Sequence, residues 1–535
     1  MARSSEIAPS DIRRRSRADT NLRVQDPTPR KKEPKRDGPC VLVVTPEITY
    51  LPDGMGNLAQ RLSAKAGGLA DVSASLVNAL YNQGADVHVA LPNYRRIFHT
   101  DVADIFHGEI RDLARHLEDK RIHLAEDRVF YHRDSVYGSE NNLIALAFQR
   151  EVINNVIPNV RPDLIHCNDW MTGLIPAVAR RRGIPCLFTV HNIHTEKMSL
   201  EHIEDRGIDA ADFWQYLYYE RPPHNYEESR STNGVDLLTS GIFAADHVNT
   251  VSPTFLSEVV DGRHDFVPGH ISHELWNKCQ ADCATGILNA PDQSFDPKSD
   301  PHLEFHFGPE DHVEGKRRNK RQLQEEFGLE LAEDAPMLFW PSRLDPVQKG
   351  PQLLTDILHQ LVTDYADLKL QIVIVANGDF QQPFHDIVAM HGIQHRVAVR
   401  DFNETLSRRG YAAADFMLMP SRFEPCGLPQ MVSPKYGTLT VAHNTGGIHD
   451  TVEPLDLAAG SGNGFLFDHF DCQGFRWAID EALRFYRQPA EVRKAHIARI
   501  MRESEARFNH ASTAKDYIKR YNAMLGKSVT KGSAE

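Results

Sequence analysis

Glu424 is an isolated acid that stands immediately before a Pro-Cys-Gly sequence, in a segment spanning residues 420–452. A carboxylate in this setting can face the hydroxyl groups or the developing positive charge of a ligand. Gly427 lets the backbone approach that ligand closely because it has no side chain. Residues 445–447 read Thr-Gly-Gly, and a glycine pair that opens a helix offers free N–H groups to an anion. The segment therefore predicts a site for an anionic, hydroxylated ligand, although two structural turns would give the same local pattern.

Short apolar runs that read as buried strands alternate with helical patterns along the chain. The helix expected after the first strand has Leu69, Val72 and Leu76 on one face. Strand, helix, strand in this rhythm gives right-handed parallel units and a doubly wound sheet. The rhythm runs twice, so we expect two Rossmann-like α/β domains, with a break at the Pro- and Asp-rich residues 289–305. The expected strands lie within residues 40–47, 86–92, 163–170 and 185–192, and then within 337–344, 370–379, 396–402, 416–421 and 439–444.

The acid and the glycine turn both follow expected strands. Ligands of a doubly wound sheet bind beyond the carboxyl ends of its strands. Glu424 follows the strand at 416–421, and the turn at 445–447 follows the strand at 439–444. We therefore expect the two to be neighbours along one edge of the second sheet. There the acid would hold the hydroxylated part of a ligand and the turn would hold its phosphate.

Composition argues against several classes of function. The formal net charge of −13 makes nucleic acid an unexpected partner, without excluding a local basic site for a phosphorylated ligand. Seven scattered cysteines suit a reducing compartment, so we expect a cytoplasmic protein. Cys279 and Cys283 are close in sequence, but no second Cys or His pair accompanies them, so no metal site is expected. No apolar run approaches about eighteen residues, so no membrane span is expected.

The two ends of the chain are expected to be disordered. Residues 1–37 are basic, contain several prolines and are poor in apolar residues, a composition that cannot bury enough surface to order itself. The stretch also lacks the apolar core of a signal peptide. We expect a solvated tail, and an electrostatic tether to an anionic partner is the alternative. Residues 527–535 are expected to form a second tail.

The segment at 420–452 closely resembles the donor-site signature of the glycogen and starch synthase family of glucosyltransferases. The family pattern is Pro-Ser-Arg-Phe-Glu-Pro-Cys-Gly-Leu, then Tyr-Gly-Thr, then Thr-Gly-Gly-Leu-x-Asp-Thr-Val. The corresponding residues here are 420–428, 436–438 and 445–452, with Ile448 in place of the leucine. A match of this length is specific.

The resemblance extends over most of residues 41–525. Residues 65–69 look like the family's Lys-x-Gly-Gly-Leu loop, 166–170 like His-x-x-Asp-Trp, and 342–350 like its Arg-Leu and Gln-Lys-Gly motif. It implies the GT-B fold, in which two Rossmann-like domains face a cleft that holds the active site. The implied parts are an acceptor-side domain at 38–295, a nucleotide-sugar domain at 296–503 and a C-terminal helix at 504–526 that returns to the first domain.

The implied activity is that of a retaining glucosyltransferase that elongates an α-1,4-glucan, such as glycogen or starch, from ADP-glucose. Two loops depart from the family pattern: residues 193–199 replace Leu-x-Tyr-Gln-Gly, and the loop before Lys65 is longer than usual. These departures keep open a GT-B transferase that uses UDP-glucose or another glycan acceptor. A non-catalytic glucan-binding relative is the third hypothesis, and the intact motif residues argue against it. We expect a monomer or a small homo-oligomer.

Transfer of glucose from a nucleoside diphosphate puts negative charge on the leaving phosphate and positive charge on the sugar ring. Fixed cations should face the phosphate, and Arg343, Lys349 and Lys65 fit this task. The resemblance implies that the first two lie there. The N–H groups of Gly446 and Gly447 are expected to add to them. Because no Asp-x-Asp motif accompanies these cations, we expect transfer without a metal ion or another cofactor.

Three residues are expected beside the sugar, and each has a plainer alternative. Glu424 is expected to hold the glucose hydroxyls or the ring charge, but it would also serve as a helix cap. The resemblance implies that His191 lies beside the sugar with its backbone carbonyl facing the ring, whereas a histidine at a strand end is otherwise a packing residue. It also implies that Asp169 lies in the cleft; the alternative is a cap for the helix that starts at Trp170. The expected catalytic residues are Glu424, His191, Asp169, Lys349 and Arg343, and the expected donor-binding residues are Lys65, Gly67, Gly68, Cys426, Gly427, Leu428, Thr445, Gly446 and Gly447, with Cys426 as a packing residue rather than a nucleophile.

Overall fold

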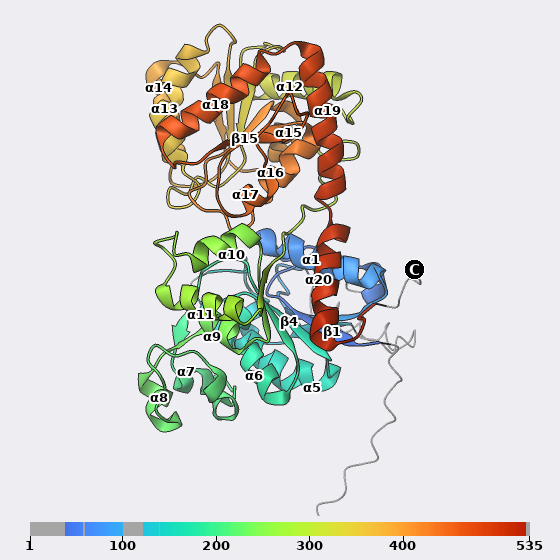
Figure 1. The fold of residues 1–535 in the computed structure, drawn as a ribbon, viewed down its shortest axis with the longest axis vertical. Coiled ribbons are helices and arrows are strands. Elements are labelled where there is room, and N and C mark those ends of the chain that lie inside the picture. The colour runs from blue at the N-terminus through green and yellow to red at the C-terminus, as the bar shows by residue number, and fades with distance from the viewer. Residues whose placement is uncertain (1–37, 57–58, 100–120, 139, 531–535) are drawn as a thin grey trace, which may run out of the picture. The chain divides into compact units, whose positions relative to one another are not determined.

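A computed structural model describes residues 38–56, 59–99, 121–138 and 140–530 of the chain. Its two main sheets are each built from parallel strands joined by helices (Figure 1). These are the two Rossmann-like α/β domains that the strand and helix rhythm predicts. The tail expected at residues 1–37 lies outside the described residues.

The first sheet has seven strands in the order β3-β2-β1-β4-β5-β8-β9, all paired in parallel. The four strands predicted for this domain are present as β1, β2, β4 and β5. The strands are β1 (Cys40–Val44), β2 (Asp86–Pro92), β3 (Ile122–Ala125), β4 (Leu164–Asn168), β5 (Cys186–Val190), β8 (His247–Thr250) and β9 (Ala284–Gly286). A separate antiparallel pair joins β6 (Lys197–Met198) to β7 (Val235–Asp236).

The second sheet has six parallel strands in the order β12-β11-β10-β13-β14-β15. Both sheets therefore have the same doubly wound order, in which the chain turns back between the first and fourth strands of the domain. All five strands predicted here are present, and β15 is additional. The strands are β10 (Met337–Trp340), β11 (Gln371–Val375), β12 (Val397–Arg400), β13 (Phe416–Met419), β14 (Leu439–His443) and β15 (Gly464–Phe467).

Helices fill the connections between these strands. The first region contains α1 (Gly68–Asn82), α3 (Arg128–Tyr131), α4 (Asn141–Glu151), α5 (Ile157–Val160), α6 (Ile175–Arg182), α7 (Leu200–Glu204), α8 (Tyr226–Thr232), α9 (Leu237–Ala244), α10 (Pro253–Val260) and α11 (Gly269–Gln280). The second contains α12 (His312–Phe327), α13 (Pro351–Asp364), α14 (Gln381–His391), α15 (Glu404–Ala413), α16 (Pro429–Val432), α17 (Gly446–Thr451), α18 (Cys472–Tyr486) and α19 (Ala490–Arg507), and α20 (His510–Leu525) follows. None of the described helices is both long and apolar enough to cross a membrane.

The core of the second domain shows why its strands read as continuous apolar runs. Successive side chains of a strand point to opposite faces of the sheet. Leu338 and Trp340 of β10 join the cluster that α13, α14 and α18 cover, whereas Met337 and Phe339 join the cluster under α12 and α15 (Figure 1). Because helices cover both faces of β10, both sets of side chains are apolar, and the alternation of a half-exposed strand is absent.

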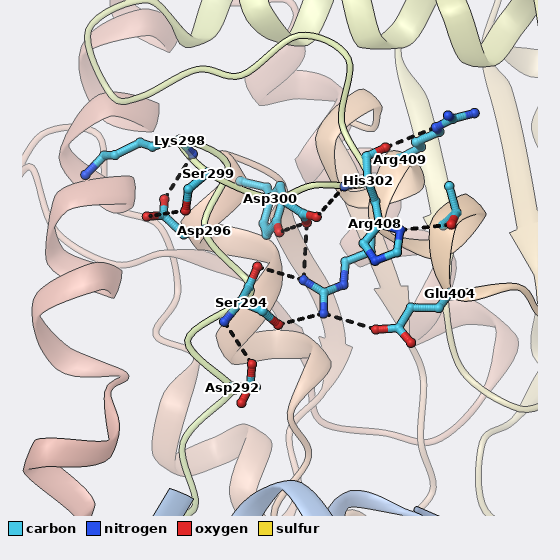
Figure 2. A network of polar contacts seen from close by, with 12 residues as sticks. Asp292, Ser294, Asp296, Lys298, Ser299, Asp300, His302, Glu404, Arg408 and Arg409 are labelled. Atoms are coloured by element: carbon cyan, nitrogen blue, oxygen red, sulfur yellow. Dashed lines mark hydrogen bonds and ion pairs between the residues drawn. The ribbon is translucent and has the colours of Figure 1, made fainter. Parts of the chain in front are cut away.

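Arg408 of α15 holds the Pro- and Asp-rich linker on the second domain (Figure 2). Its guanidinium donates to the Ser294 carbonyl at 2.7 Å and to the Ser294 hydroxyl at 2.8 Å, and it lies 3.3 Å from Asp300 Oδ2. The Tyr436 hydroxyl donates to the same Asp300 oxygen at 2.5 Å. Arg408 is 5% exposed, so these groups compensate each other in a nearly dry environment. The linker is thus fixed where the chain enters the second domain.

The C-terminal helix α20 packs against the first domain. Its Tyr521 hydroxyl hydrogen-bonds with His166 Nδ1 at 2.8 Å, and its Tyr517 hydroxyl accepts from Asn249 Nδ2 at 3.0 Å. Residues 527–530, which were expected to belong to a terminal tail, are placed: Val529 is 2% exposed, and its N–H donates to the Asn522 side chain at 2.8 Å. Val529 joins the apolar core of the first domain, and this packing together with the hydrogen bond holds the short piece in place. Residues 531–535 lie outside the described residues.

Candidate active site

The candidate residues of the first domain lie where its strand order turns back. Asp169 directly follows β4, and His191 directly follows its neighbour β5. The Asp169 carboxylate accepts from the His191 backbone N–H at 2.7 Å and from Asn192 Nδ2 at 3.0 Å. The two candidates are therefore brought together, and the acid fixes the backbone turn that carries the histidine.

The backbone of Asp169 is strained. Its φ of 59° and ψ of 176° lie in a region that residues with a side chain rarely adopt. Such a conformation costs of order 1–3 kcal/mol and persists only where the surroundings impose it, which is often at functional sites. Here the Asp169 N–H is held by the Thr189 carbonyl at 3.0 Å, and the side chain is held as described above. The strain turns the carboxylate toward the end of β5.

Burial sets the charge states of this pair. It raises the pKa of Asp169 to about 7; the hydrogen bonds from residues 191 and 192 oppose the shift, and the negative charge of Glu47 adds to it. Burial also lowers the pKa of His191 to about 3, so its ring is neutral near pH 7. The His191 Nε2 atom hydrogen-bonds with Asn168 Oδ1 at 2.9 Å and must therefore carry the proton. With Nε2 protonated, the neutral ring keeps Nδ1 as an acceptor and carries no positive charge.

Glu47 is a site residue that the sequence analysis missed. It follows β1, the strand next to β4, and its carboxylate accepts from the backbone N–H groups of Ala66 at 2.8 Å and Gly67 at 3.0 Å. The Tyr137 hydroxyl donates to its other oxygen at 2.7 Å. Glu47 is 2% exposed, so these donors compensate a buried acid. A charged residue just after a buried strand at the point where the sheet order turns back was the available signal.

The loop that opens α1 is only partly free to bind a ligand. The Gly67 N–H is engaged by Glu47. Lys65 pairs with Asp71 at 2.9 Å, but its side chain remains 47% exposed, so the ammonium group can still reach an anion. Gly68 lies against the second domain, because a side chain there would start 3.5 Å from Leu428 Cδ1. The loop thus meets the segment that carries Glu424.

In the second domain, Glu424 and Lys349 form an ion pair. Their Oε2 and Nζ atoms are 2.5 Å apart, and Ser421 Oγ donates to the same oxygen at 3.2 Å. Both side chains are largely buried. Arg343, which follows β10, is exposed and has no hydrogen bond or ion pair to any residue in the described part of the chain. It is therefore a cation held at the carboxyl edge of the sheet with its charge still available.

Cys426, Gly427 and Leu428 shape this edge. Cys426 packs with Val251, Met431 and other apolar residues, and burial raises the pKa of its thiol to about 12. A thiol in this environment stays protonated, which favours the packing task expected for it. Gly427 has a φ of 73°, the left-handed conformation that glycine adopts without strain.

The turn at 445–447 does not offer the free N–H groups that the sequence predicts. The Gly446 N–H donates to both carboxylate oxygens of Glu258, at 3.1 and 3.0 Å, and the Gly447 N–H donates to the Glu424 carbonyl at 2.9 Å. The two amides expected to face the leaving phosphate are therefore engaged within the protein, and that expectation is corrected. The physical reason is that α10 brings a carboxylate to the anion site that the turn creates.

Comparison with known proteins then identifies the family. The starch synthase catalytic domain model matches residues 41–269, and the glycosyl transferases group 1 model matches residues 322–499. The glycogen synthase of Desulforudis audaxviator is 34% identical over 505 residues, which cover 87% of this chain and 94% of that protein. The glycogen synthase of Bacillus licheniformis is 32% identical over 454 residues, covering 80% of this chain and 89% of that protein. The chain belongs to the glycogen synthase family.

Solved structures confirm the GT-B fold of this glycogen synthase family member. The catalytic domain of starch synthase IV from Arabidopsis thaliana, bound to ADP and acarbose, matches with a TM-score of 0.73 and 25% identity, covering 92% of this chain and 100% of that chain. A sucrose-phosphate synthase from Thermosynechococcus elongatus, 16% identical, shares the fold with a TM-score of 0.54 over 91% of this chain and 99% of that one. The resemblance noted from the sequence is confirmed, and the chain is a glycosyltransferase.

One group of described residues in this glycogen synthase family member could hold a metal ion. Cys40, Asp86 and His88 each offer a ligand atom within 4.8 Å of the others. They lie where β1 and β2 begin, whereas the candidate active-site residues lie where strands end. Asp86 already pairs with Arg121 at 3.1 Å. The group is thus outside the candidate active site and carries no step of the transfer.

The pKa of Asp169 predicts the acid limb of the pH–rate profile for this synthase. The carboxylate accepts two hydrogen bonds, so the productive form is the deprotonated one, which is lost as the pH falls through about 7. We expect kcat/KM to fall about tenfold per pH unit below that point. The Asp169→Asn variant has no carboxylate to titrate at this position. The acid limb should therefore be absent from its pH–rate profile, although its rate should be lower. A wild-type limb near the ordinary carboxylate pKa of about 4, unchanged in Asp169→Asn, would contradict the assignment.

Proposed function

We propose that this protein transfers glucose from ADP-glucose to the end of an α-1,4-glucan with retention of the α configuration. The observation that carries the proposal is the carboxyl edge of the second sheet, which carries the Lys349–Glu424 ion pair and Arg343. Arg343 follows β10, which ends at Trp340, and has no ion pair among the described residues. β10 and β13 are hydrogen-bonded neighbours, so the loops that follow them lie side by side at the carboxyl edge of the sheet, where such sheets bind ligands. Two cations and one acid on these loops fit a sugar diphosphate.

The charges divide between the two parts of the donor. As the C1–O bond breaks, negative charge builds on the diphosphate, and we assign its stabilisation to Arg343 and Lys349. Positive charge builds on the sugar ring, and Glu424 supplies the opposing charge. The Lys349–Glu424 contact holds both side chains in place, so little reorganisation is needed when the charges develop.

The first domain would complete the sugar site. Asp169 fixes the turn that carries His191, and we assign the His191 backbone carbonyl to face the charge on the sugar ring, as the family resemblance implies. Lys65, half exposed, adds a further cation toward the diphosphate. These assignments follow the family resemblance and the contacts described above, and they predict that no protein nucleophile is needed.

Phe402 is a candidate platform for the nucleobase that the sequence analysis missed. It follows β12, its side chain is 53% exposed, and its N–H is held by Asn377 Oδ1 at 2.9 Å. β12 lies two strands from β10, a distance of about 10 Å at the usual strand spacing. This spacing between the strands that precede Phe402 and Arg343 is of the order of the reach from a phosphate to a base, and an exposed ring favours stacking.

ADP-glucose is proposed over UDP-glucose on family grounds. The starch synthase IV structure carries ADP and acarbose. The loops at 193–199 and before Lys65 differ from the family pattern, so UDP-glucose or another glycan acceptor is the alternative. We also propose a cytoplasmic location and a monomeric or small homo-oligomeric state, because all seven cysteines are free thiols, as a reducing compartment would keep them.

A panel of radiolabelled donors tests this proposal. ADP-glucose and UDP-glucose are each offered with glycogen and with maltose, and label in the polymer is measured. We expect incorporation from ADP-glucose into glycogen at a rate at least about tenfold above that from UDP-glucose. A preference for UDP-glucose would overturn the donor assignment, and transfer to neither acceptor would overturn the glucan assignment.

A further inference from the structure

Helix α10 lies in the first domain and helix α17 in the second. Each of them places a carboxylate at the N-terminus of the other. Asp450 of α17 accepts from Thr254 Oγ1 at 2.6 Å and from the Thr254 N–H at 3.2 Å, and it also accepts from the Ser252 hydroxyl. In return, Glu258 of α10 accepts from the Gly446 N–H, at 3.1 and 3.0 Å. We call these residues the reciprocal cap.

The half of the cap formed by Glu258 is nearly dry. Glu258 is 6% exposed, and Thr445, whose hydroxyl donates to it at 3.2 Å, is 3% exposed. His264 Nε2 lies 3.0 Å from the same carboxylate. Burial raises the pKa of Glu258, but the hydrogen bonds from His264 and Gly446 outweigh it and leave the pKa below its usual value. The group is therefore charged near neutral pH, and the amides it holds are not easily released.

The turn held by Glu258 is locked to the backbone of Glu424. The Gly447 N–H donates to the Glu424 carbonyl at 2.9 Å. A side chain on Gly446 would start 2.0 Å from that carbonyl oxygen, so the two backbones are in direct contact. Gly446 also has a φ of 45°, which glycine adopts readily. Any shift of the turn must therefore move the backbone that carries the Glu424 side chain.

We propose that Glu258 is a positioning residue for Glu424, which acts by holding the turn at 445–447 against the Glu424 carbonyl. This inference rests on the proposed function, in which the Glu424 carboxylate faces the sugar ring. It gives the engaged Gly446 amide a task other than phosphate binding. It also makes the placement of Glu424 depend on a residue of the acceptor-side domain.

Asp450 provides a matched control because it belongs to the same cap without touching the Glu424 backbone. Glu258→Gln keeps one acceptor and loses the charge, Glu258→Ala removes both acceptors, and Asp450→Asn weakens the opposite half of the cap. We expect kcat to fall about 10- to 100-fold in Glu258→Gln, and further in Glu258→Ala, with the donor KM changed by less than about threefold. Asp450→Asn should keep kcat within about threefold of the wild-type value. Its thermal stability should fall by about as much as that of Glu258→Gln.

A second readout does not depend on the substrate. Hydrogen exchange of the backbone amides in residues 420–428 should accelerate at least about tenfold in Glu258→Gln and remain as in the wild type in Asp450→Asn. If wild-type protein transfers no glucose, the proposed function fails, and this exchange still tests the coupling. Equal exchange and equal kcat in Glu258→Gln and Asp450→Asn would show that Glu258 is only a structural cap and would overturn the proposal. If Glu258→Ala fails to fold, the comparison of Glu258→Gln with Asp450→Asn decides whether the proposal holds.

Discussion

Replacing Glu424 by glutamine should lower kcat for glucosyl transfer by about 10²-fold or more while leaving the fold intact. The amide keeps the size of the carboxyl group and can still accept from Ser421 Oγ, but it loses the charge. That charge matters most as the ring becomes positive, so the effect should appear in kcat more than in the donor KM. Steady-state kinetics with ADP-glucose and glycogen measures both.

The ion pair supplies the control for this variant. Glu424→Gln leaves Lys349, whose side chain is 12% exposed, without its partner, and this should cost about 1–3 kcal/mol of unfolding free energy. The double variant Glu424→Gln with Lys349→Met should recover part of that stability without recovering kcat. Full kcat in Glu424→Gln would show that Glu424 is only a structural residue. A glucosylated Glu424 peptide, trapped and found by mass spectrometry, would contradict an electrostatic task.

Loss of the Arg343 charge is expected to have the next largest effect. Arg343→Ala should lower kcat about 10²-fold, because it removes a fixed cation from the leaving phosphate. The fold should not change, since Arg343 has no hydrogen bond or ion pair in the described parts of the chain. Lys349→Ala should lower kcat similarly but also destabilise the protein, because it leaves Glu424 unpaired. Kinetics and thermal melts on the same preparations separate the two effects.

Arg484 offers a surface control for this series. It lies on α18 with its side chain 67% exposed and pairs only with Glu481 among the salt bridges of the described residues. Arg484→Ala should leave kcat within about twofold of the wild type, as most surface substitutions do. If Arg343→Ala behaves like Arg484→Ala, the donor site does not use Arg343, and the phosphate assignment is wrong.

The sequence predicted the fold well where strands buried on both faces are also runs of apolar residues. β10 and β13 are continuous apolar runs, and so is β11 after Gln371, because each face packs against helices. β8, which reads His-Val-Asn-Thr, and the three-residue β9 were missed. β8 is fully buried, but its polar side chains hydrogen-bond with other elements, such as Asn249 with Tyr517, so it shows no apolar run. A local sequence pattern cannot reveal hydrogen-bond partners that lie so far away along the chain.

The candidate site was predictable only as far as its residues follow strands. Asp169, Arg343 and Glu424 each come after a strand, so the parallel topology alone places them at carboxyl edges. The contact between Glu258 and Gly446 joins residues 188 positions apart and depends on how α10 meets α17. No local pattern encodes that meeting. Free amides were therefore expected at a turn where the fold supplies an internal carboxylate.

Proton NMR of the product made from ADP-glucose and a maltooligosaccharide tests the central claim most directly. The account predicts a new anomeric signal from an α-linked glucose at the 4-position of the acceptor's end, growing with time and absent without enzyme. Retention is expected from the family resemblance, and because Glu424 is proposed to act through its charge rather than as a nucleophile, no covalent intermediate is expected. A β-linked product, or hydrolysis of the donor without chain growth, would contradict the account.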